Sequence, residues 1–307
     1  MKRIGAIIVG LACLSAAAHA IAPYGELDDA LLTDVKNGMK VVKASLFSGN
    51  VPNAGKPSQA LVWVTIPGGQ FKLGTSDFDD AKPTGETYTI KTFDVSKTLV
   101  TVEQYDECVI KGGCTKPDTG KNCNSYKWGR QLHPVNCVDW VQANKYAEFL
   151  NNKPENKDKK VRLLSEAEYE YAARSGGKKQ KYPWGNEDAT CERAVMSNGC
   201  GSGTTMPVCL KPKGNTNIEG LSADKQLCDM VGNVWQWVQD KYQNSYANTP
   251  LDGSASEGPG YRDFRGFRGG SFGRMHADYL RADYRNAFDP AARDESRGFR
   301  LARVRRD

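Results

Sequence analysis

The sequence predicts an α+β fold with few regular elements and long loops that disulfides tie together. Three capping boxes mark the starts of short helices. The segments with strand-like composition are few and short, and Gly-rich stretches separate them. Of the nine cysteines, all except Cys13 fall between residues 108 and 228, so bridges are available to order the intervening loops.

Helices are expected where a Thr, Asp or Ser side chain, with a Gln or Glu three residues later, can satisfy the free amide groups of a first helical turn. Glycine pairs at 112–113 and 176–177 end the first and third of these helices. Aromatic and apolar residues recur at helical spacing after the boxes, which indicates faces packed in the core. The three boxes are Thr101 with Gln104, Asp139 with Gln142, and Ser165 with Glu168.

Strands are expected over four short runs, Leu61–Ile66, Thr87–Val95, Phe264–Phe267 and Phe299–Val304. From the first of these runs to the C-terminus, no repeat, low-complexity tract or boundary interrupts the chain. We therefore expect a single domain over residues 61–307.

The first twenty residues have the three parts of a secretory signal peptide. Lys2 and Arg3 form a positive start, the stretch 4–18 is almost unbroken apolar sequence, and Ala18-His19-Ala20 is a small-x-small cleavage site. The apolar stretch is short for a membrane span. We expect residues 1–20 to be removed, and the mature protein to be periplasmic or secreted with no remaining span.

Residues 21–60 are expected to form an N-terminal extension and linker. The stretch 26–46 is compatible with a helix. The stretch 48–58 is rich in Gly, Pro, Asn and Ser, which is typical of a linker.

The composition excludes several classes of protein. Of the 307 residues, 39% are hydrophobic and 25% are charged, which excludes a collagen, an extended disordered chain and a membrane protein with several spans. The formal net charge of +6 falls to +4 when Lys2 and Arg3 leave with the signal peptide. The arginines near the C-terminus are interpreted as a partly structural set, so no nucleic-acid partner is expected.

The eight cysteines left after removal of the signal peptide predict four disulfides in an oxidising compartment. A zinc site is disfavoured because there is no CxxC spacing and only two histidines remain, His133 and His276. Many connectivities are open, and the short spacings favour one of them. The favoured pairs are Cys108–Cys114, Cys123–Cys137, Cys191–Cys200 and Cys209–Cys228.

Five motifs, in order along residues 61–304, carry a resemblance to a known family. They are Ile66–Gly74 (IPGGQFKLG), His133–Val135 with Val138–Trp140, Arg162–Arg174 (RLLSEAEYEYAAR) followed by Tyr182–Gly185, Asp229–Trp237 (DMVGNVWQW), and Arg268–Phe272 (RGGSF) with Arg281, Arg285 and Gly298–Arg300. The chain resembles the formylglycine-generating enzyme family, also called the sulfatase-modifying factor family. The resemblance implies a C-type-lectin-like α+β domain with little regular secondary structure.

The resemblance also implies where catalytic cysteines would stand. In the oxidases of the family, two cysteines shortly after the GGS motif bind copper as thiolates and oxidise a substrate cysteine with oxygen. Arg274 and Tyr279 occupy those positions here, and no cysteine follows Cys228. Because neither side chain replaces a thiolate for a soft metal, neither copper nor formylglycine-generating activity is expected.

Two other branches of the family imply different chemistry. One branch makes sulfoxides with iron, whose histidine ligands come from an additional helical domain. The extension 21–60 is too short for that domain and contains no histidine, so iron is not expected. Another branch acts in the periplasm on siderophore chromophores, and the present chain resembles it in compartment and fold.

Calcium is the structural ion that the resemblance implies. One family site uses an Asn, backbone carbonyls and a Glu of the GNxWEW loop. Asn233 is retained here, and Gln236 replaces the Glu. A neutral amide oxygen can ligate calcium more weakly, so calcium at Asn233 and Gln236 is expected as one alternative. The other is a Gly-Asn turn without a metal.

The segment after Arg268 corresponds to the active cleft of the family. The cleft is expected to be lined by Trp235, Ser271, Arg274, His276, Tyr279, Arg281 and Arg285. The catalytic candidates are His276 as a general base, Arg274 and Ser271. Arginines and an aromatic wall indicate an anionic or peptide ligand. The alternative is that Arg281, Arg285 and Arg300 pair with nearby acids and hold loops.

These observations favour an exported domain whose cleft binds a peptide, a glycan or an envelope protein without generating formylglycine. The alternative is a periplasmic oxidase or maturation enzyme with altered chemistry. A third hypothesis is a structural subunit that docks through residues 21–60.

Overall fold

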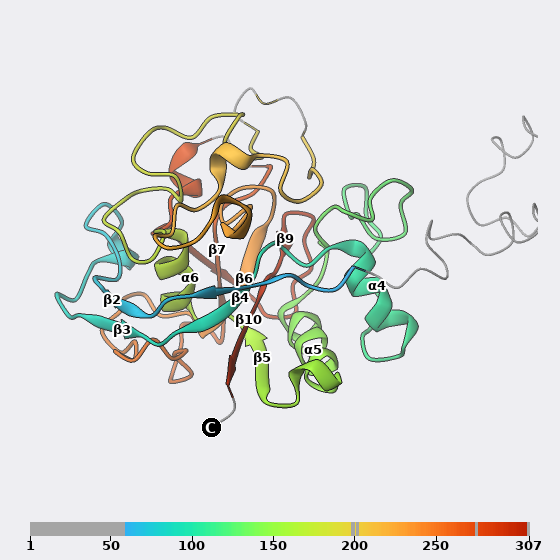
Figure 1. Cartoon of the computed structure of the whole chain (residues 1–307), viewed down its shortest axis with the longest axis horizontal. Helices are drawn as coiled ribbons and strands as arrows, with labels where there is room; N and C mark the ends of the chain where they lie inside the picture. Colours follow the sequence, from blue (N-terminus) through green and yellow to red (C-terminus); the bar gives the residue numbers. More distant parts are fainter. Residues whose placement is uncertain (1–58, 198–199, 201–202, 274–275, 306–307) are drawn as a thin grey trace, which may run out of the picture. The chain divides into compact units, whose positions relative to one another are not determined.

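The structure is a computed structural model that describes residues 59–197, 200, 203–273 and 276–305 (Figure 1). These residues belong to one compact unit, Pro57–Asp307. The expected signal peptide, all but the last two residues of the 21–60 extension, and Arg274 lie outside them. Among the described residues, no helix has both the length and the apolar character that a membrane crossing needs.

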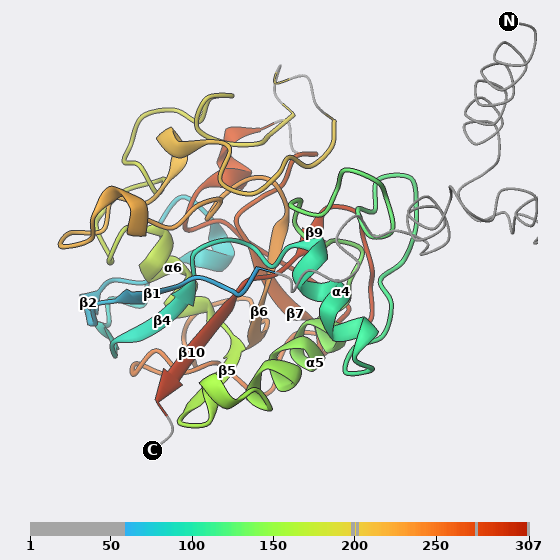
Figure 2. The same ribbon diagram turned by 45° about the vertical axis from the view of Figure 1, so that its right-hand side comes forward.

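One four-stranded sheet joins the two ends of the domain. Its strands stand in the order β1-β4-β10-β5, and every pairing is antiparallel. The last strand, β10, therefore lies between strands from much earlier in the chain (Figures 1 and 2). The strands are β1 (Trp63–Ile66), β4 (Phe93–Ser96), β5 (Lys159–Leu163) and β10 (Leu301–Arg305).

A second four-stranded sheet has the order β8-β7-β6-β9, and a two-stranded ribbon pairs β2 with β3. β6 runs antiparallel to β7 and parallel to β9. The strands of the second sheet are β6 (Trp235–Lys241), β7 (Arg265–Arg268), β8 (Arg285–Phe288) and β9 (Arg297–Gly298). The ribbon consists of β2 (Gly69–Phe71) and β3 (Tyr88–Ile90).

Each capping box begins a helix at the expected residue. The helices are α4 (Val102–Ile110), α5 (Trp140–Asn151) and α6 (Glu166–Ala173), and both hydrogen bonds of each box are present. Five short 3-10 helices complete the described elements: η1 (Asp79–Ala81), η2 (Pro154–Asn156), η3 (Pro212–Gly214), η4 (Ala223–Lys225) and η5 (Ala277–Leu280). The expected α+β class with sparse regular structure is confirmed.

The strand predictions need correction at several places. The expected strand Thr87–Val95 is two strands, because β3 pairs with β2 whereas β4 pairs with β1 and β10. β5, β6, β8 and β9 were not among the expected strands. β6 carries several polar residues. Two of them, Gln236 and Asp240, are buried and hydrogen-bonded within the protein.

Four disulfides tie the loops of the described chain. They join the same four pairs that the short spacings favour, Cys108–Cys114, Cys123–Cys137, Cys191–Cys200 and Cys209–Cys228. All lie between the start of α4 and the start of β6 in sequence. This region contains most of the long irregular segments, so the bridges lie where regular hydrogen bonding is sparse.

The core consists of two large apolar clusters. One lies between the two-stranded ribbon, the first sheet and α6, and it includes Phe71, Tyr88 and Tyr171. The other lies against α4 and α5 and includes Trp235 and Trp237 of β6. Helix α6 thus separates apolar packing on one side from the polar cluster described next.

Candidate functional site

Helix α6 is buried along its whole length, although it carries three carboxylates, Glu166, Glu168 and Glu170. A buried carboxylate is costly unless it is paired and hydrogen-bonded. Glu168 completes the capping box of its own helix and accepts a 2.6 Å hydrogen bond from Arg162. The other two carboxylates face arginines that follow in the second half of the chain.

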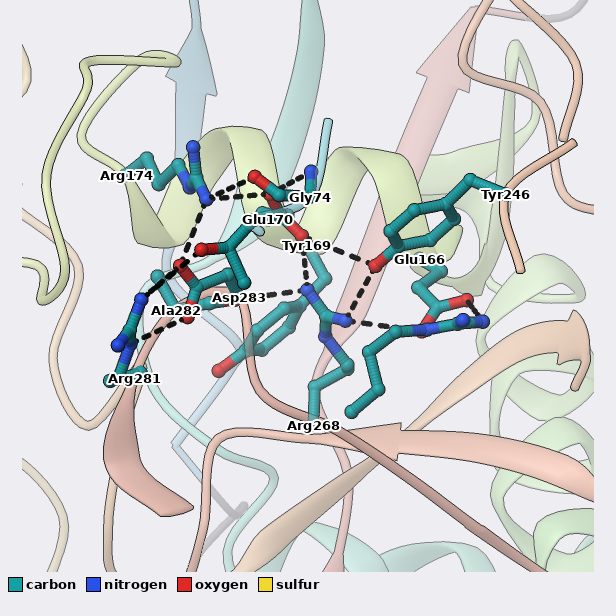
Figure 3. A network of polar contacts seen from close by, with 12 residues as sticks. Gly74, Glu166, Tyr169, Glu170, Arg174, Tyr246, Arg268, Arg281, Ala282 and Asp283 are labelled. Atoms are coloured by element: carbon teal, nitrogen blue, oxygen red, sulfur yellow. Dashed lines mark hydrogen bonds and ion pairs between the residues drawn. The ribbon is translucent and has the colours of Figure 1, made fainter. Parts of the chain in front are cut away.

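Arg268, at the end of β7, lies between these two carboxylates and is completely buried. It donates to Glu170 Oε2 at 2.6 Å and to Glu166 Oε1 at 3.1 Å. It also donates to the Tyr246 hydroxyl at 3.0 Å and to the Ala282 carbonyl at 2.9 Å. Figure 3 shows this guanidinium at the centre of the network.

Arg285, at the start of β8, is the second cation that neutralises the buried carboxylates Glu166 and Glu170. Its Nε and Nη2 donate to Glu166 at 2.7 and 2.8 Å, and its guanidinium lies 4.2 Å from the centre of the Tyr246 ring. Burial opposes ionisation of Glu166, but attraction from Arg285 and then Arg268 outweighs it, so the pKa of Glu166 is lowered. The carboxylate is held charged inside the protein.

The same network continues to the far end of α6. Arg174, the C-cap residue, contacts Glu170 and Asp283 at 3.1 Å each. Arg281 donates to both oxygens of Asp283 at 2.9 Å and lies 2.6 Å from Asp77. Asp283 therefore bridges two guanidinium groups, as Figure 3 shows.

Gly74 connects the loop after β2 to this end of the network. Its N–H donates to Glu170 at 2.8 Å, and its carbonyl accepts from Arg174 at 2.9 Å. It has φ +93°, and a Cβ there would lie 2.3 Å from the carbonyl oxygen of Ala81. Only glycine fits this position without displacing the backbone.

A pocket of about 830 Å³ opens beside Arg174 and Arg281. Three segments form it: the loop after β2, the stretch that follows α6, and the residues after η5. Its lining consists of Lys72, Gly74, Thr75, Ser76, Asp77, Pro83, Arg174, Gly177, Lys179, Gln180, Lys181, Asn186, Arg281 and Asp283. This is the candidate ligand site.

The structure separates the residues that the sequence placed in one cleft. Arg281 lines the pocket, whereas Arg285 lies inside the network. The alternative that Arg281 pairs with a nearby acid is confirmed, and the acid is Asp283. Arg285 pairs instead with Glu166, which the sequence did not suggest. Among the described residues, Arg300 forms no ion pair with a carboxylate, and it donates to Gln236 and to backbone carbonyls.

Trp235 and Ser271 are buried away from the pocket, so the prediction that they line an accessible cleft is wrong. Trp235 is fully buried, and its ring packs edge-on against Phe267 at 5.2 Å. The pleat of β6 directs this side chain into the core. Ser271 is also fully buried, and its hydroxyl has no hydrogen-bond partner within the described residues. It is therefore not placed to act as a nucleophile.

The other two described candidates lie on η5 or directly before it. His276 is exposed, and Tyr279 is half-buried. Their rings meet edge-on at 6.1 Å, and Tyr279 packs against Tyr284 at 4.9 Å. Neither residue lines the pocket.

The turn at Asn233 and Gln236 does not fit calcium in this arrangement. Gln236 Oε1 accepts a 2.6 Å hydrogen bond from the buried guanidinium of Arg300, and that positive charge would repel a cation at the same oxygen. Asn233 Oδ1 accepts from the Met206 amide at 3.2 Å. Asn233 has φ +63°, a backbone conformation that asparagine adopts in tight turns. Elsewhere among the described residues, no cluster of three or more His, Cys, Asp and Glu forms a metal site.

The residues present do not fit a copper site of the thiolate type either. All eight cysteines of the described chain are in disulfides, and a disulfide sulfur is not a thiolate ligand. No reaction step is therefore derived through copper.

Sequence reasoning missed most of the pocket. Arg174 belongs to the RLLSEAEYEYAAR motif, where Glu166, Glu170 and Arg174 are spaced four residues apart. Charges at this spacing on a helix with no polar face could have indicated a buried network. Lys72, Lys179 and Lys181 left no such signal, because lysines in loops are common.

Comparisons with known proteins agree with this fold. Residues 49–305 match the family described as sulfatase-modifying factor enzyme 1-like domain. The structure of PvdO from Pseudomonas aeruginosa superposes with a TM-score of 0.65 and 28% identity, covering 81% of this chain and 99% of PvdO.

Two curated relatives differ in how much of their length is matched. The formylglycine-generating enzyme of Streptomyces coelicolor is 26% identical over 308 residues, covering 81% of this chain and 91% of that enzyme. The serine/threonine-protein kinase Pkn1 of Chlamydia trachomatis is 30% identical over 266 residues, covering 81% of this chain. The chain spans only 39% of that kinase.

Proposed function

Because the chain belongs to the family of sulfatase-modifying factor enzyme 1-like domains, we propose that it is an exported member that binds a ligand and does not generate formylglycine. The observation that carries this proposal is the placement of the cysteines, all of which are in disulfides within the described chain. The two expected copper positions hold Arg274 and Tyr279, and all eight cysteines of the described chain are in disulfides. The described cysteines therefore leave no thiolate for a soft metal.

Export is supported by the same bridges. Disulfides persist in oxidising compartments and are rare in the cytosol. Cys13 falls within the apolar stretch of the expected signal peptide, so its removal would leave an even number of cysteines. We place the mature protein in the periplasm or outside the cell.

Ligand binding is supported by the pocket beside α6. Its two arginines are positioned by buried carboxylates rather than by flexible surface contacts, and preorganised groups lose little freedom on binding. A peptide, a glycan or an envelope protein with a charged group is the ligand class that this function implies.

The test measures three quantities on the purified protein: its free thiols, its bound copper and the formylglycine that it forms. We expect the purified mature protein to show no free thiol in denaturant, to retain no copper after gel filtration, and to form no formylglycine from a cysteine-containing sulfatase peptide under oxygen. The matched control is the double variant R274C/Y279C, which places thiols at both positions and is expected to retain copper. Formylglycine formation by the unaltered protein would contradict the proposal.

An oxidase of altered chemistry is the second candidate, and the exposure of His276 favours it. An exposed imidazole beside Tyr279 can exchange protons with a substrate. Substrate-dependent oxygen uptake that disappears in His276→Ala would support this candidate over the first.

A further inference from the structure

The pocket beside α6 has an excess of positive charge. Within the described residues, its ionisable lining consists of five cations, Lys72, Arg174, Lys179, Lys181 and Arg281, and two carboxylates, Asp77 and Asp283. The formal charge of this lining is therefore +3. In a concave site, low-dielectric walls concentrate such a field.

The two arginines do not carry this excess. Arg174 contacts Glu170 and Asp283, and Arg281 contacts Asp283 and Asp77. Because both guanidinium groups are nearly buried, with 8% of each side chain exposed, they form a fixed floor. Their remaining N–H groups stay able to donate to an oxyanion.

The three lysines carry the excess. No ion pair within the described part of the chain involves Lys72, Lys179 or Lys181, and all three are exposed. Lys72 donates to the carbonyl of Gly85. The carbonyl of Lys181 accepts from the Ala282 amide at 2.7 Å, which holds Lys181 beside the pocket floor.

The effect of these cations is visible at the rim. The side chain of Asp77 is 50% exposed. Its pKa is lowered by the hydrogen bond and charge of Arg281, and to a smaller extent by the charge of Lys181. Asp77 is thus a carboxylate of the protein itself that is bound by the cations of the pocket.

We propose that this pocket binds a small oxyanionic ligand with at least two negative charges, in phosphate or carboxylate groups. The inference rests on the proposed ligand-binding function and names the chemical class of its ligand. A volume of about 830 Å³ lies within the roughly 300–1,000 Å³ of small-molecule sites. The fixed arginines orient one group, and the lysines on their flexible stems neutralise the other.

A cationic ligand does not fit the same pocket. Both lining carboxylates already pair with arginines, Asp283 with two of them and Asp77 with one. A bound cation would have to compete with guanidinium groups for those oxygens, in the field of three further lysines.

The experiment is isothermal titration of the mature protein with inorganic pyrophosphate and, separately, with citrate. We expect saturable one-to-one binding of at least one probe, and the better probe distinguishes a phosphate ligand from a carboxylate ligand. The variant K72Q/K179Q/K181Q lacks three positive charges that attract the anionic probe, so its Kd for the better probe should be about tenfold higher or more.

Two further variants keep the test specific. Asp77→Asn removes a competing carboxylate and should lower the Kd roughly threefold. Lys145→Gln removes an exposed lysine of α5 outside the pocket and should leave the Kd within about twofold of the original. Absence of saturable binding to both probes, or equal weakening in Lys145→Gln and the triple variant, would overturn the proposal.

Failure here is distinguishable from failure of the proposed function. A protein that forms no formylglycine and binds neither probe would overturn the ligand class alone. A protein that forms formylglycine would overturn the proposed function, whatever its affinity for pyrophosphate or citrate.

Discussion

The two ends of helix α6 use the same residue types differently. Toward its start, Arg268 and Arg285 are enclosed with Glu166 and Glu170, and these two positive and two negative charges balance inside the protein. At its end, Arg174 and Arg281 are also paired, but the same open pocket is lined by lysines that form no ion pair with any described residue. The proposed ligand site thus lies at the end of α6 where the lining cations outnumber the lining carboxylates. The first arrangement stabilises the fold, and the second leaves charge for a ligand.

The largest effect is expected at the enclosed end. Arg268→Met would leave Glu166 and Glu170 buried with one cation fewer, which should lower the free energy of unfolding by about 3–5 kcal/mol. Urea denaturation measures this loss. The control Lys145→Met breaks a pair whose side chains are both more than half exposed and should cost less than about 1 kcal/mol. Similar losses in both variants would remove the distinction between enclosed and exposed pairs.

Asp283 is the buried carboxylate that pairs with both arginines of the open end, so its replacement should affect both stability and ligand binding. Asp283→Asn should lower the free energy of unfolding by about 2 kcal/mol. This is less than the loss expected when a buried charge loses every partner, because Arg174 still pairs with Glu170 and Arg281 still pairs with Asp77. The same variant should bind pyrophosphate more tightly, since the pocket gains net positive charge. Asp278→Asn, at an exposed residue of η5, is the control. Weaker binding in D283N would show that Asp283 positions the arginines more than it opposes the ligand.

The enclosed end should also respond to pH. Burial, and then the charge of Glu166, raise the pKa of Asp240 to about 7, against about 3.9 in an unfolded chain. The folded protein therefore binds more protons between these values, and its free energy of unfolding should fall by about 1 kcal/mol per unit as pH rises from 5 to 7. Thermal or urea unfolding at several pH values measures this slope. Asp240→Asn should flatten it, and an unchanged slope would assign the dependence to other groups.

The smallest effect on stability is expected at the open end. The variant K72Q/K179Q/K181Q removes three exposed charges with no ion-pair partner among the described residues, and should change the free energy of unfolding by less than about 0.5 kcal/mol. Urea denaturation beside the binding measurement checks this. A large loss of stability would mean that these lysines support the fold, and the stability effects at the two ends of α6 would then not differ as expected.

Much of the local structure could be predicted from the sequence. The capping boxes at Thr101, Asp139 and Ser165 begin helices because their hydrogen bonds join residues only three apart. The disulfides follow the short spacings for the same reason, since nearby cysteines meet at little cost in chain entropy. The pairing of Arg281 with Asp283, two residues apart, is equally local.

The candidate site could be predicted only in part. The motif around Arg281 directed attention to the correct segment, but Trp235 and Ser271 are buried instead of lining a cleft. Their exposure depends on which face of the second sheet is covered, and spacing along the chain carries no such information. The partner of Arg285, Glu166, is 119 residues away.

The sequence by itself determined the family, the α+β class, the helix starts and the favoured disulfide pairs, because each depends on residues close together in the chain or on a recognisable motif. Only the tertiary structure decided which charges are balanced. Coulomb interactions depend on distances in space, and the pocket brings together the loop after β2, the end of α6 and the residues after η5. Whether a lysine there is an ordinary surface residue or part of a binding site is set by those distances.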